Sequence, residues 1–430
     1  MDYMATIEQH ESEVRSYVRN FPTVFDKASG SYLYNTDGEA YLDFFAGASV
    51  MNYGHNHPEL KQALLDYIGS DRATHTMDMA SVARAEFLDT FRETILKPRG
   101  LNFRVQFPGP TGTNAVESAL KVARKATGRT DVVCFTNAFH GMTLGALAVT
   151  GNHFKRNGAG VPLNYTHTLP FDGYMGDSDS VDYLEKMLQD GASGIGHPAA
   201  VVVETIQAEG GVNVASGEWL KRLQDLCRRH DMLFIVDDIQ TGNGRTGYFF
   251  SFEEFGLDPD VVAVSKSLSG YGFPLALTLI KPEYDVWAPG EHNGTFRGFN
   301  PAIVTAKRTL ELFWSDDSFA REIRAKGEHV RRFLDGLVKK YPEARGCPRG
   351  RGLMQAVEFA NRDLADKITE KAFTHNLIIE TAGADDETLK LLPPLTTDYA
   401  DLDKGLGIIE QSLVEAMDEL GIRGPRAAAQ

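Results

Sequence analysis

The sequence predicts an α/β protein in which a large domain with a mostly parallel sheet is joined to a small α+β domain from both termini. From about residue 56 to 305, short apolar runs alternate with longer helical patterns, which is typical of parallel strands covered by helices. The chain has 430 residues, which is long for one hydrophobic core. We therefore expect a large domain over residues 56–305 and a small domain formed by residues 1–55 and 306–430.

The N-terminal region predicts one helix and one β-hairpin. Residues Glu11–Arg19 carry two valines four residues apart, which indicates one apolar face of a helix. The apolar runs Ser31–Tyr34 and Ala40–Phe44 flank the dipeptide Asp37-Gly38, which favours a tight turn between antiparallel strands.

Six strands and an intervening helix are predicted in the large domain. The first strand alternates polar and apolar residues, and the others are nearly continuous apolar runs, as expected for strands buried on both faces. The strands are Arg104–Phe107, Asp131–Phe135, Ala199–Thr205, Met232–Asp237, Val261–Val264 and Ala276–Ile280. A helix over Ala115–Lys125 follows the first of them.

The C-terminal region predicts a long helical stretch after Pro301, three short strands and a final helix. The three strands are Leu353–Phe359, Leu377–Glu380 and Lys390–Leu392, and the helix runs from about Leu402 to Leu420. The tail 424–430 is expected to be frayed.

Composition restricts the partners and the location of the protein. The formal net charge is −15, which disfavours nucleic acid and anionic lipid as partners. No apolar run reaches the roughly 18 residues of a transmembrane helix, and the N-terminus lacks a signal-peptide pattern, so no membrane association is expected. Cys134, Cys227 and Cys347 have neither close pairing nor metal-ligand spacing, so we expect three buried thiols in a cytoplasmic protein.

Candidate ligand-binding residues follow the predicted strands, at the end where an open α/β sheet binds its ligands. Gly112 and Thr113 lie between the strand Arg104–Phe107 and the next helix, where a glycine and free N–H groups suit a phosphate. A tight turn with Thr113 as the helix N-cap is the alternative. Phe139 follows the second strand and could stack on a planar ligand, or it could pack in the core.

An acid and a lysine follow two further strands. Asp237 should be partly buried and in need of a cation or hydrogen-bond donors, unless it is a solvated or N-capping carboxylate. Lys266 follows Val261–Val264, where it is either an amine nucleophile of lowered pKa or a snorkelling, ion-paired lysine. Together with the phosphate loop and the aromatic ring, these groups are what pyridoxal 5'-phosphate (PLP) requires. His55 and His57 suggest no third ligand, so no metal site is expected.

Seven segments of the chain resemble the class III (ω- and ornithine-type) aminotransferases of PLP fold type I. The segments are Asn52–Pro58, Thr111–Glu117, Phe139–Gly141, Glu204–Gly211, Asp237–Gly247, Ser265-Lys266 and Lys390–Leu395. The resemblance covers nearly the whole chain and implies this fold, this cofactor and an aminotransferase activity.

The resemblance also implies roles for residues around the cofactor. Gly112 and Thr113 match the phosphate loop, and Phe139 matches the aromatic that stacks on the ring. Asp237 matches the acid on the pyridine nitrogen, and Gln240 the residue near the ring hydroxyl.

Two further matches concern catalysis and assembly. Lys266 matches the Schiff-base lysine. Thr295 matches a threonine that reaches the phosphate of the neighbouring subunit, which implies a homodimer or a higher homo-oligomer.

Longer strings are most similar to the diaminobutyrate-forming branch of the class, which serves ectoine biosynthesis. These strings are Glu11–Arg19, Phe21–Phe25, Phe139–Asn152, Gly290–Gly298 and Leu389–Leu395. The closer resemblance implies transfer of the amino group of L-glutamate to L-aspartate 4-semialdehyde, giving L-2,4-diaminobutyrate and 2-oxoglutarate.

Substrate binding departs from the wider class. Met142 and Lys390 stand where ornithine-type relatives have arginines, and Ala48 stands where a bulky aromatic is expected. Lysine is a point charge without the bidentate fork of arginine, so the binding of the substrate carboxylates differs. We expect Glu209 and Lys390 to pair and to separate when the extra carboxylate of glutamate arrives, with Arg297 as a second candidate anchor.

Two alternatives remain at this point. Another ω-aminotransferase would act on ornithine, acetylornithine or 4-aminobutyrate, although Met142 and Lys390 argue against a simple copy of those sites. A non-catalytic PLP-binding regulator would need a basic DNA-binding segment, whereas the N-terminus is short and acidic.

Overall fold

The centre of the protein is a seven-stranded sheet. The structure is a computed structural model that describes residues 1–176 and 179–422, and the expectation for the tail 424–430 lies outside them. The strand order is β4-β12-β11-β10-β7-β5-β6. The strands are β4 (Arg104–Gln106), β5 (Val132–Phe135), β6 (Thr166–Leu169), β7 (Ala200–Val203), β10 (Leu233–Asp237), β11 (Val261–Val264) and β12 (Leu277–Ile280).

The sheet is mostly parallel, as predicted. β12 runs antiparallel to both of its neighbours, β4 and β11, while β6, β5, β7, β10 and β11 pair in parallel. All six predicted strands are present. β6 was not predicted, because the edge strand Thr166–Leu169 has three consecutive polar residues and is mostly only partly buried.

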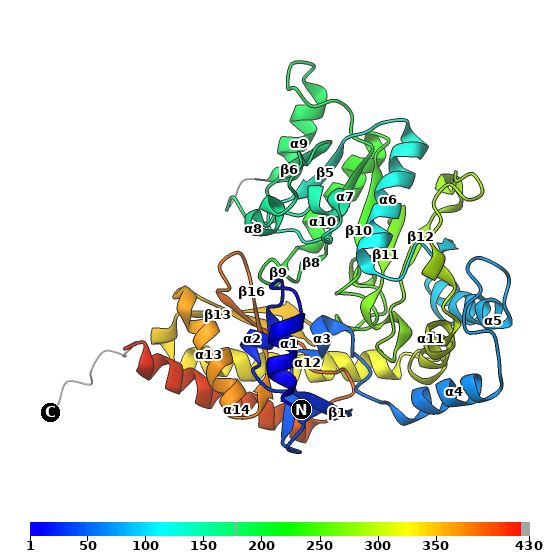
Figure 1. The fold of residues 1–430 in the computed structure, drawn as a ribbon. Helices are drawn as coiled ribbons and strands as arrows, with labels where there is room; N and C mark the ends of the chain where they lie inside the picture. Colours follow the sequence, from blue (N-terminus) through cyan, green and yellow to red (C-terminus); the bar gives the residue numbers. More distant parts are fainter. Residues whose placement is uncertain (177–178, 423–430) are drawn as a thin grey trace.

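Helices cover both faces of this sheet because successive strand residues point to opposite sides. Val132 of β5 belongs to the apolar cluster that contains Val116 of α6 (Gly112–Thr127). Val133 belongs to the cluster that contains Leu220 of α10 (Gly217–Arg229). Figure 1 shows α6 lying along one face of the sheet.

The remaining elements of this region connect and cover the sheet. The helices are α4 (Pro58–Gly69), α5 (Val82–Phe91), α7 (Leu144–Ala148), α8 (His153–Asn157), α9 (Ser180–Gln189) and α11 (Asn300–Phe313). The short helices are η1 (Arg92–Leu96), η2 (Lys97–Arg99), η3 (Glu253–Phe255), η4 (Lys266–Ser269), η5 (Pro282–Tyr284) and η6 (Thr295–Gly298), and a small ribbon is formed by β8 (Ile206–Gln207) and β9 (Asn213–Val214).

Both ends of the chain meet in a four-stranded sheet of order β1-β2-β3-β15. Its strands are β1 (Phe25–Ser29), β2 (Tyr32–Asn35), β3 (Ala40–Asp43) and β15 (Leu377–Ile378). β2 and β3 form the predicted hairpin. Because β15 pairs in parallel with β3, the C-terminal part of the chain packs against the N-terminal part, and Figure 1 shows both below the large sheet. The residue boundaries proposed for the two domains remain a prediction.

A second four-stranded sheet of order β13-β14-β17-β16 completes this part of the molecule. Its strands are β13 (Gly346–Arg351), β14 (Met354–Phe359), β17 (Thr388–Leu391) and β16 (Glu380–Ala382). The helices beside it are α12 (Ser318–Lys340), η7 (Pro342–Ala344), α13 (Arg362–Thr374) and α14 (Tyr399–Glu419).

Two strand predictions in this region need correction. The predicted strand Leu377–Glu380 divides into β15 and β16, which belong to different sheets. β13 was not predicted, because Gly346-Cys347-Pro348 is an atypical strand sequence that an edge position tolerates. Cys347 on this edge strand is exposed, so the expectation of three buried thiols is correct only for Cys134 and Cys227.

The predicted helix over Glu11–Arg19 is wrong. The N-terminus instead forms α1 (Tyr3–His10) and α2 (Tyr17–Asn20), separated by a turn. The Asp2 carboxylate caps α1 by accepting the Ala5 N–H at 3.0 Å, which moves the helix start upstream. Val14 is 88% exposed while Val18 is half-buried, so the two valines that predicted the helix do not form one buried face.

No helix within residues 1–176 and 179–422 is both long enough and apolar enough to span a bilayer.

Candidate active site

The C-terminal ends of the parallel strands enclose a cavity of about 170 Å³. Six of the seven residues predicted to bind the cofactor line it, and Glu209 joins them. The six are Gly112, Thr113, Phe139, Asp237, Gln240 and Lys266. The structure thus brings together residues that lie up to 154 positions apart in the chain.

One end of the cavity is the start of α6. The N-cap is Thr111 and not Thr113, because the N–H and hydroxyl of Thr111 both donate to Asn114 Oδ1, at 3.2 and 2.8 Å. Gly112 and Thr113 therefore lie in the first turn, where N–H groups have no partner within the helix and attract anions. A Cβ on Gly112 would lie 2.9 Å from Cδ1 of Ile239, so the close approach of these segments requires glycine.

Asp237 ends β10 with its carboxylate buried, and two donors hold it. Its Oδ2 lies 2.7 Å from Nδ1 of His140, and its Oδ1 accepts the Ile239 N–H at 3.1 Å. Burial favours the neutral imidazole of His140, but the hydrogen bond to Asp237 and the charges of Asp237 and Glu204 together outweigh burial and raise the pKa of His140. This arrangement supplies the hydrogen-bond donors that the sequence led us to expect for Asp237.

Phe139 is half-buried and faces the cavity, so the alternative of core packing does not apply. Its N–H donates to Oε1 of Glu204 at 3.0 Å, and the Nζ of Lys155 lies 4.3 Å from the centre of its ring. Burial raises the pKa of Glu204 to about 8. By accepting the Phe139 N–H, Glu204 fixes the backbone that carries the aromatic ring.

Lys266 opens η4 directly after β11, in the left-handed region with φ of 52°. Its Nζ donates to the carbonyl oxygen of Ala48 at 2.9 Å. Burial lowers the pKa of Lys266 to about 8, so a substantial fraction of the amine is neutral near that pH. A neutral amine is the nucleophilic form, which agrees with the functional interpretation of this lysine.

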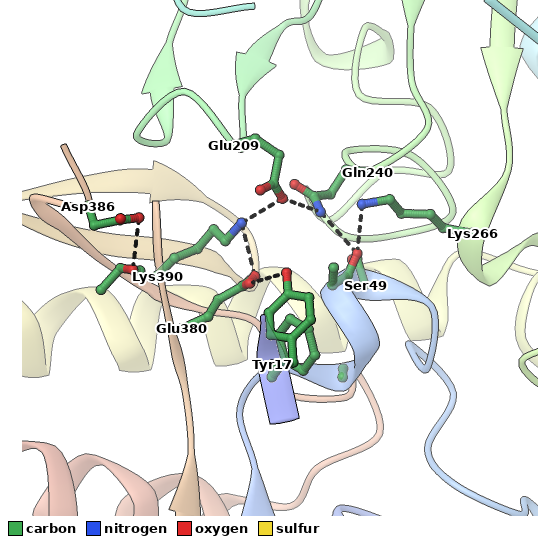
Figure 2. A network of polar contacts seen from close by, with 12 residues as sticks. Tyr17, Ser49, Glu209, Gln240, Lys266, Glu380, Asp386 and Lys390 are labelled. Carbon is green, nitrogen blue, oxygen red and sulfur yellow. Dashed lines mark hydrogen bonds and ion pairs between the residues drawn. The ribbon is translucent and has the colours of Figure 1, made fainter. Parts of the chain in front are cut away.

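A polar network extends from Gln240 to the small sheets, as Figure 2 shows. The expected pair is present, with Lys390 Nζ 2.8 Å from Oε1 of Glu209. Lys390 also lies 2.9 Å from Oε1 of Glu380, whose Oε2 accepts the Tyr17 hydroxyl at 3.4 Å. Gln240 donates to Glu209 Oε1 and to a backbone carbonyl oxygen, each at 3.0 Å.

The network perturbs the titration of its carboxyl groups in opposite directions. Burial alone would raise the pKa of Glu209, but the ammonium groups of Lys390 and Lys266, with the hydrogen bonds from Lys390 and Gln240, together outweigh burial and hold that pKa well below its usual range. Burial raises the pKa of Glu380 to about 7, because the same ammonium compensates it less fully. Lys390 has no exposed surface and keeps its charge, since the two carboxylates raise its pKa.

Thr295 and Arg297 do not line this cavity. Both belong to η6, where the Thr295 carbonyl oxygen lies 2.8 Å from Nε2 of His75. Arg297 donates to Oδ1 of Asn293 at 2.8 Å and lines a separate cavity beside β4. The roles expected of Thr295 and Arg297 in cofactor and substrate binding remain predictions.

Four residues of the site were missed, namely His140, Glu204, Glu380 and Tyr17. His140 and Glu204 lie within segments that resemble the family, and Glu204 follows an apolar strand just as Asp237 does, so the same signal could have found it. Tyr17 lies within the string Glu11–Arg19, which is similar to the diaminobutyrate-forming branch. Glu380 ends the predicted strand Leu377–Glu380, so an acid after an apolar run could have found it as well, although its partners come from distant segments.

Comparison with known proteins gives consistent matches over nearly the whole chain. The model of the family "Aminotransferase class-III" matches residues 14–413. A diaminobutyrate–2-oxoglutarate transaminase of Marinococcus halophilus is 54% identical over 97% of this chain and 97% of its own. An enzyme of the same name from Streptomyces coelicolor is 55% identical over 96% and 98%.

Solved structures share the fold. The ornithine aminotransferase of Toxoplasma gondii is 27% identical, with a TM-score of 0.83 over 97% of this chain and 96% of that one. An aminotransferase of Bacillus anthracis superposes with a TM-score of 0.85 at 22% identity, over 96% and 98%. These matches confirm the α/β fold with a mostly parallel large sheet that the sequence predicted.

Proposed function

The chain belongs to the class-III aminotransferase family, and on this basis we propose that it transfers the amino group of L-glutamate to C4 of L-aspartate 4-semialdehyde. The products are L-2,4-diaminobutyrate and 2-oxoglutarate. The observation that carries this proposal is the identity of more than half of all residues, over nearly the full chain, to relatives named for diaminobutyrate transamination. Such identity favours this reaction over those on ornithine, acetylornithine or 4-aminobutyrate.

Pyridoxal 5'-phosphate is the cofactor of this family, and the cavity fits it. The first turn of α6 offers unpaired N–H groups to a phosphate. Asp237 provides a carboxylate for the pyridine nitrogen, and Phe139 provides an aromatic face. Oε1 of Gln240 is buried and has no hydrogen-bond partner within the described residues, so it can accept a hydrogen bond from the ring hydroxyl.

In the proposed mechanism Lys266 is the catalytic lysine. It would hold the cofactor until the substrate amine displaces it, and its amine would then move the proton at the substrate carbon that bears nitrogen. When bound, the cofactor supplies the electron sink for this step. The lowered pKa of Lys266, about 8, leaves enough neutral amine to act as a base.

Asp237 is the second catalytic group of the proposal. Its negative charge would keep the pyridine nitrogen protonated, because an opposite charge nearby favours the protonated form. His140 orients the Asp237 carboxylate, because its Nδ1 lies 2.7 Å from Oδ2 of Asp237.

Substrate selection rests on Glu209 and Lys390 in this proposal. While they are paired, the site suits a substrate end without an extra carboxylate. The second carboxylate of glutamate would displace Glu209 and bind Lys390. Arg297 is proposed as a further anchor, and because it shares η6 with Thr295, it would act in the site of a neighbouring subunit of a homodimer or higher homo-oligomer.

We further propose a cytoplasmic location, on the basis of the three free cysteines.

An absorbance spectrum combined with a substrate panel tests this function. Wild-type holoenzyme should show a band near about 400–430 nm, as expected for PLP bound to lysine. Lys266→Ala should lose this band and all activity, whereas the control Lys281→Ala, a partly buried lysine paired with Asp258 and Asp260, should keep both.

The panel separates the candidate substrates. Wild type should form diaminobutyrate from glutamate and the semialdehyde with ping-pong kinetics, since two half-reactions share one cofactor. A requirement for a ternary complex, or a clear preference for ornithine or 4-aminobutyrate, would contradict the proposal.

A further inference from the structure

Lys390 lies between two carboxylates in a buried place. Its Nζ is 2.8 Å from Glu209 and 2.9 Å from Glu380, and its side chain has no exposed surface. With both acids ionised, the three side chains carry one net negative charge. When the second carboxylate of glutamate displaces Glu209 from Lys390, the site holds three carboxylates and one Lys390 ammonium, and uncompensated charge in a buried site is costly.

The two carboxylates are not equally supported. Glu209 accepts hydrogen bonds from both Lys390 and Gln240, at 2.8 and 3.0 Å. Glu380 is 7% exposed, and among the described residues its Oε1 has one polar contact, the Lys390 ammonium at 2.9 Å. Its Oε2 accepts only the long contact of 3.4 Å from the Tyr17 hydroxyl among the described residues.

We propose that Glu380 takes up a proton when the second carboxylate of glutamate reaches Lys390 and releases it when a substrate end without that carboxylate takes its place. The proton comes from solvent and forms an O–H bond on the Glu380 carboxylate, and the return step reverses this. Glu380 is then a specificity-determining residue that allows one site to accept a substrate end with a second carboxylate and a substrate end without it. The inference rests on the proposed function, because it requires glutamate as the donor.

The groups around Glu380 are consistent with this exchange. Lys390 of β17 favours the ionised form of Glu380, whereas the negative charge of Glu209 disfavours it. The long contact to the Tyr17 hydroxyl of α2, at 3.4 Å, stabilises the Glu380 anion only weakly. Lys266 of η4 also faces it and favours ionisation. The resulting pKa of Glu380, raised to about 7 by burial, places the proton exchange within reach of neutral pH.

The pH dependence of dicarboxylate binding to the holoenzyme tests the proposal. Glutarate supplies two carboxylates without an amine, and butyrate supplies one. Above pH 7 the Kd for glutarate should rise about tenfold per pH unit, because one proton is taken up with each molecule bound. The Kd for butyrate should not show this rise. Calorimetry in two buffers of different ionisation enthalpy should report close to one proton taken up with glutarate at pH 8.5.

Variants distinguish Glu380 from other titrating groups. Glu380→Gln resembles the protonated carboxyl, so it should bind glutarate about 30-fold more tightly than wild type at pH 8.5, with no proton uptake, since 1.5 pH units above 7 correspond to about that factor. A purely structural role would instead weaken binding. The control Glu370→Gln removes an exposed carboxylate on the neighbouring α13 and should behave like wild type.

The results distinguish a failure of the proposed role of Glu380 from a failure of the proposed function. Glutarate binding without a pH-dependent Kd in wild type, or proton uptake that persists in Glu380→Gln, would overturn the role of Glu380 and leave the proposed function intact. The wild-type measurement decides this even if the variant fails to fold. No glutarate binding at any pH would overturn both, because the site would then not accept two carboxylates.

Discussion

Replacing Lys390 with methionine should destabilise the folded protein strongly at high pH and weakly at low pH. The substitution leaves Glu209 and Glu380 buried without the ammonium that lies 2.8 and 2.9 Å from them. Removing one partner of a buried ion pair costs about 3–5 kcal/mol. For 430 residues at about 2.1 cal/mol/K each, the unfolding entropy is about 0.9 kcal/mol/K, so Tm should fall by about 3–6 °C.

The pH dependence of this loss follows from the carboxyl groups. Without Lys390, the folded-state pKa values of both acids lie above their unfolded value of about 4.3, so stability is lost as pH rises from that value through the folded pKa. In wild type, the pKa of Glu209 is lowered instead, so its contribution is present above pH 4.3. The deficit of Lys390→Met should therefore be small near pH 5 and largest near pH 8.

Thermal unfolding of the holoenzyme, followed by circular dichroism at pH 5 and pH 8, measures this effect. Adding Glu209→Gln to Lys390→Met removes one of the two unpaired charges and should recover part of the lost Tm at pH 8. An equal Tm for wild type and Lys390→Met at pH 8, or a double variant no more stable than the single one, would refute the reasoning.

Further substitutions test other parts of the structure. Gly112→Ala should weaken cofactor retention about tenfold, because the new Cβ would lie 2.9 Å from Ile239. Adding Ile239→Ala in the same chain should restore retention. An unchanged cofactor absorbance after dialysis of the single variant would count against this contact. His140→Leu should lower kcat about tenfold with little change in thermal stability, since it removes a charge-assisted hydrogen bond to Asp237. A kcat equal to that of wild type would exclude the role of His140 in positioning Asp237. Val14→Ser should change the unfolding free energy by less than about 0.5 kcal/mol, because the side chain is 88% exposed, and a larger loss in chemical denaturation would show that this segment packs after all.

Much of the cofactor site could be predicted because its residues follow buried strands. Asp237 and Lys266 each end an apolar run, where a charged group is costly unless it has a partner or a function. The fold places such positions at one edge of a parallel sheet, so their proximity follows from topology. His140 could have been added by the same reasoning, since Asp237 requires a donor nearby.

The substrate side could be predicted only in part. Glu209 and Lys390 are 181 residues apart, and their pairing was expected from charge and family resemblance rather than from local pattern. The contact of Glu380 with Lys390 was not predicted, because Glu380 ends the predicted strand Leu377–Glu380 but begins β16 of a second sheet in the structure. The helix expected over Glu11–Arg19 failed because Asp2 caps an earlier helix, and side-chain capping outweighed a weak apolar periodicity.

The fate of the glutamate nitrogen tests the proposed reaction most directly. Holoenzyme is incubated with glutamate labelled with nitrogen-15 and with L-aspartate 4-semialdehyde, and the diaminobutyrate formed is analysed by NMR. The label should appear on the nitrogen at carbon 4 and not at carbon 2, and Lys266→Ala should form no labelled product. Label at carbon 2, unlabelled product, or labelled product from Lys266→Ala would contradict amino transfer to the aldehyde carbon through Lys266.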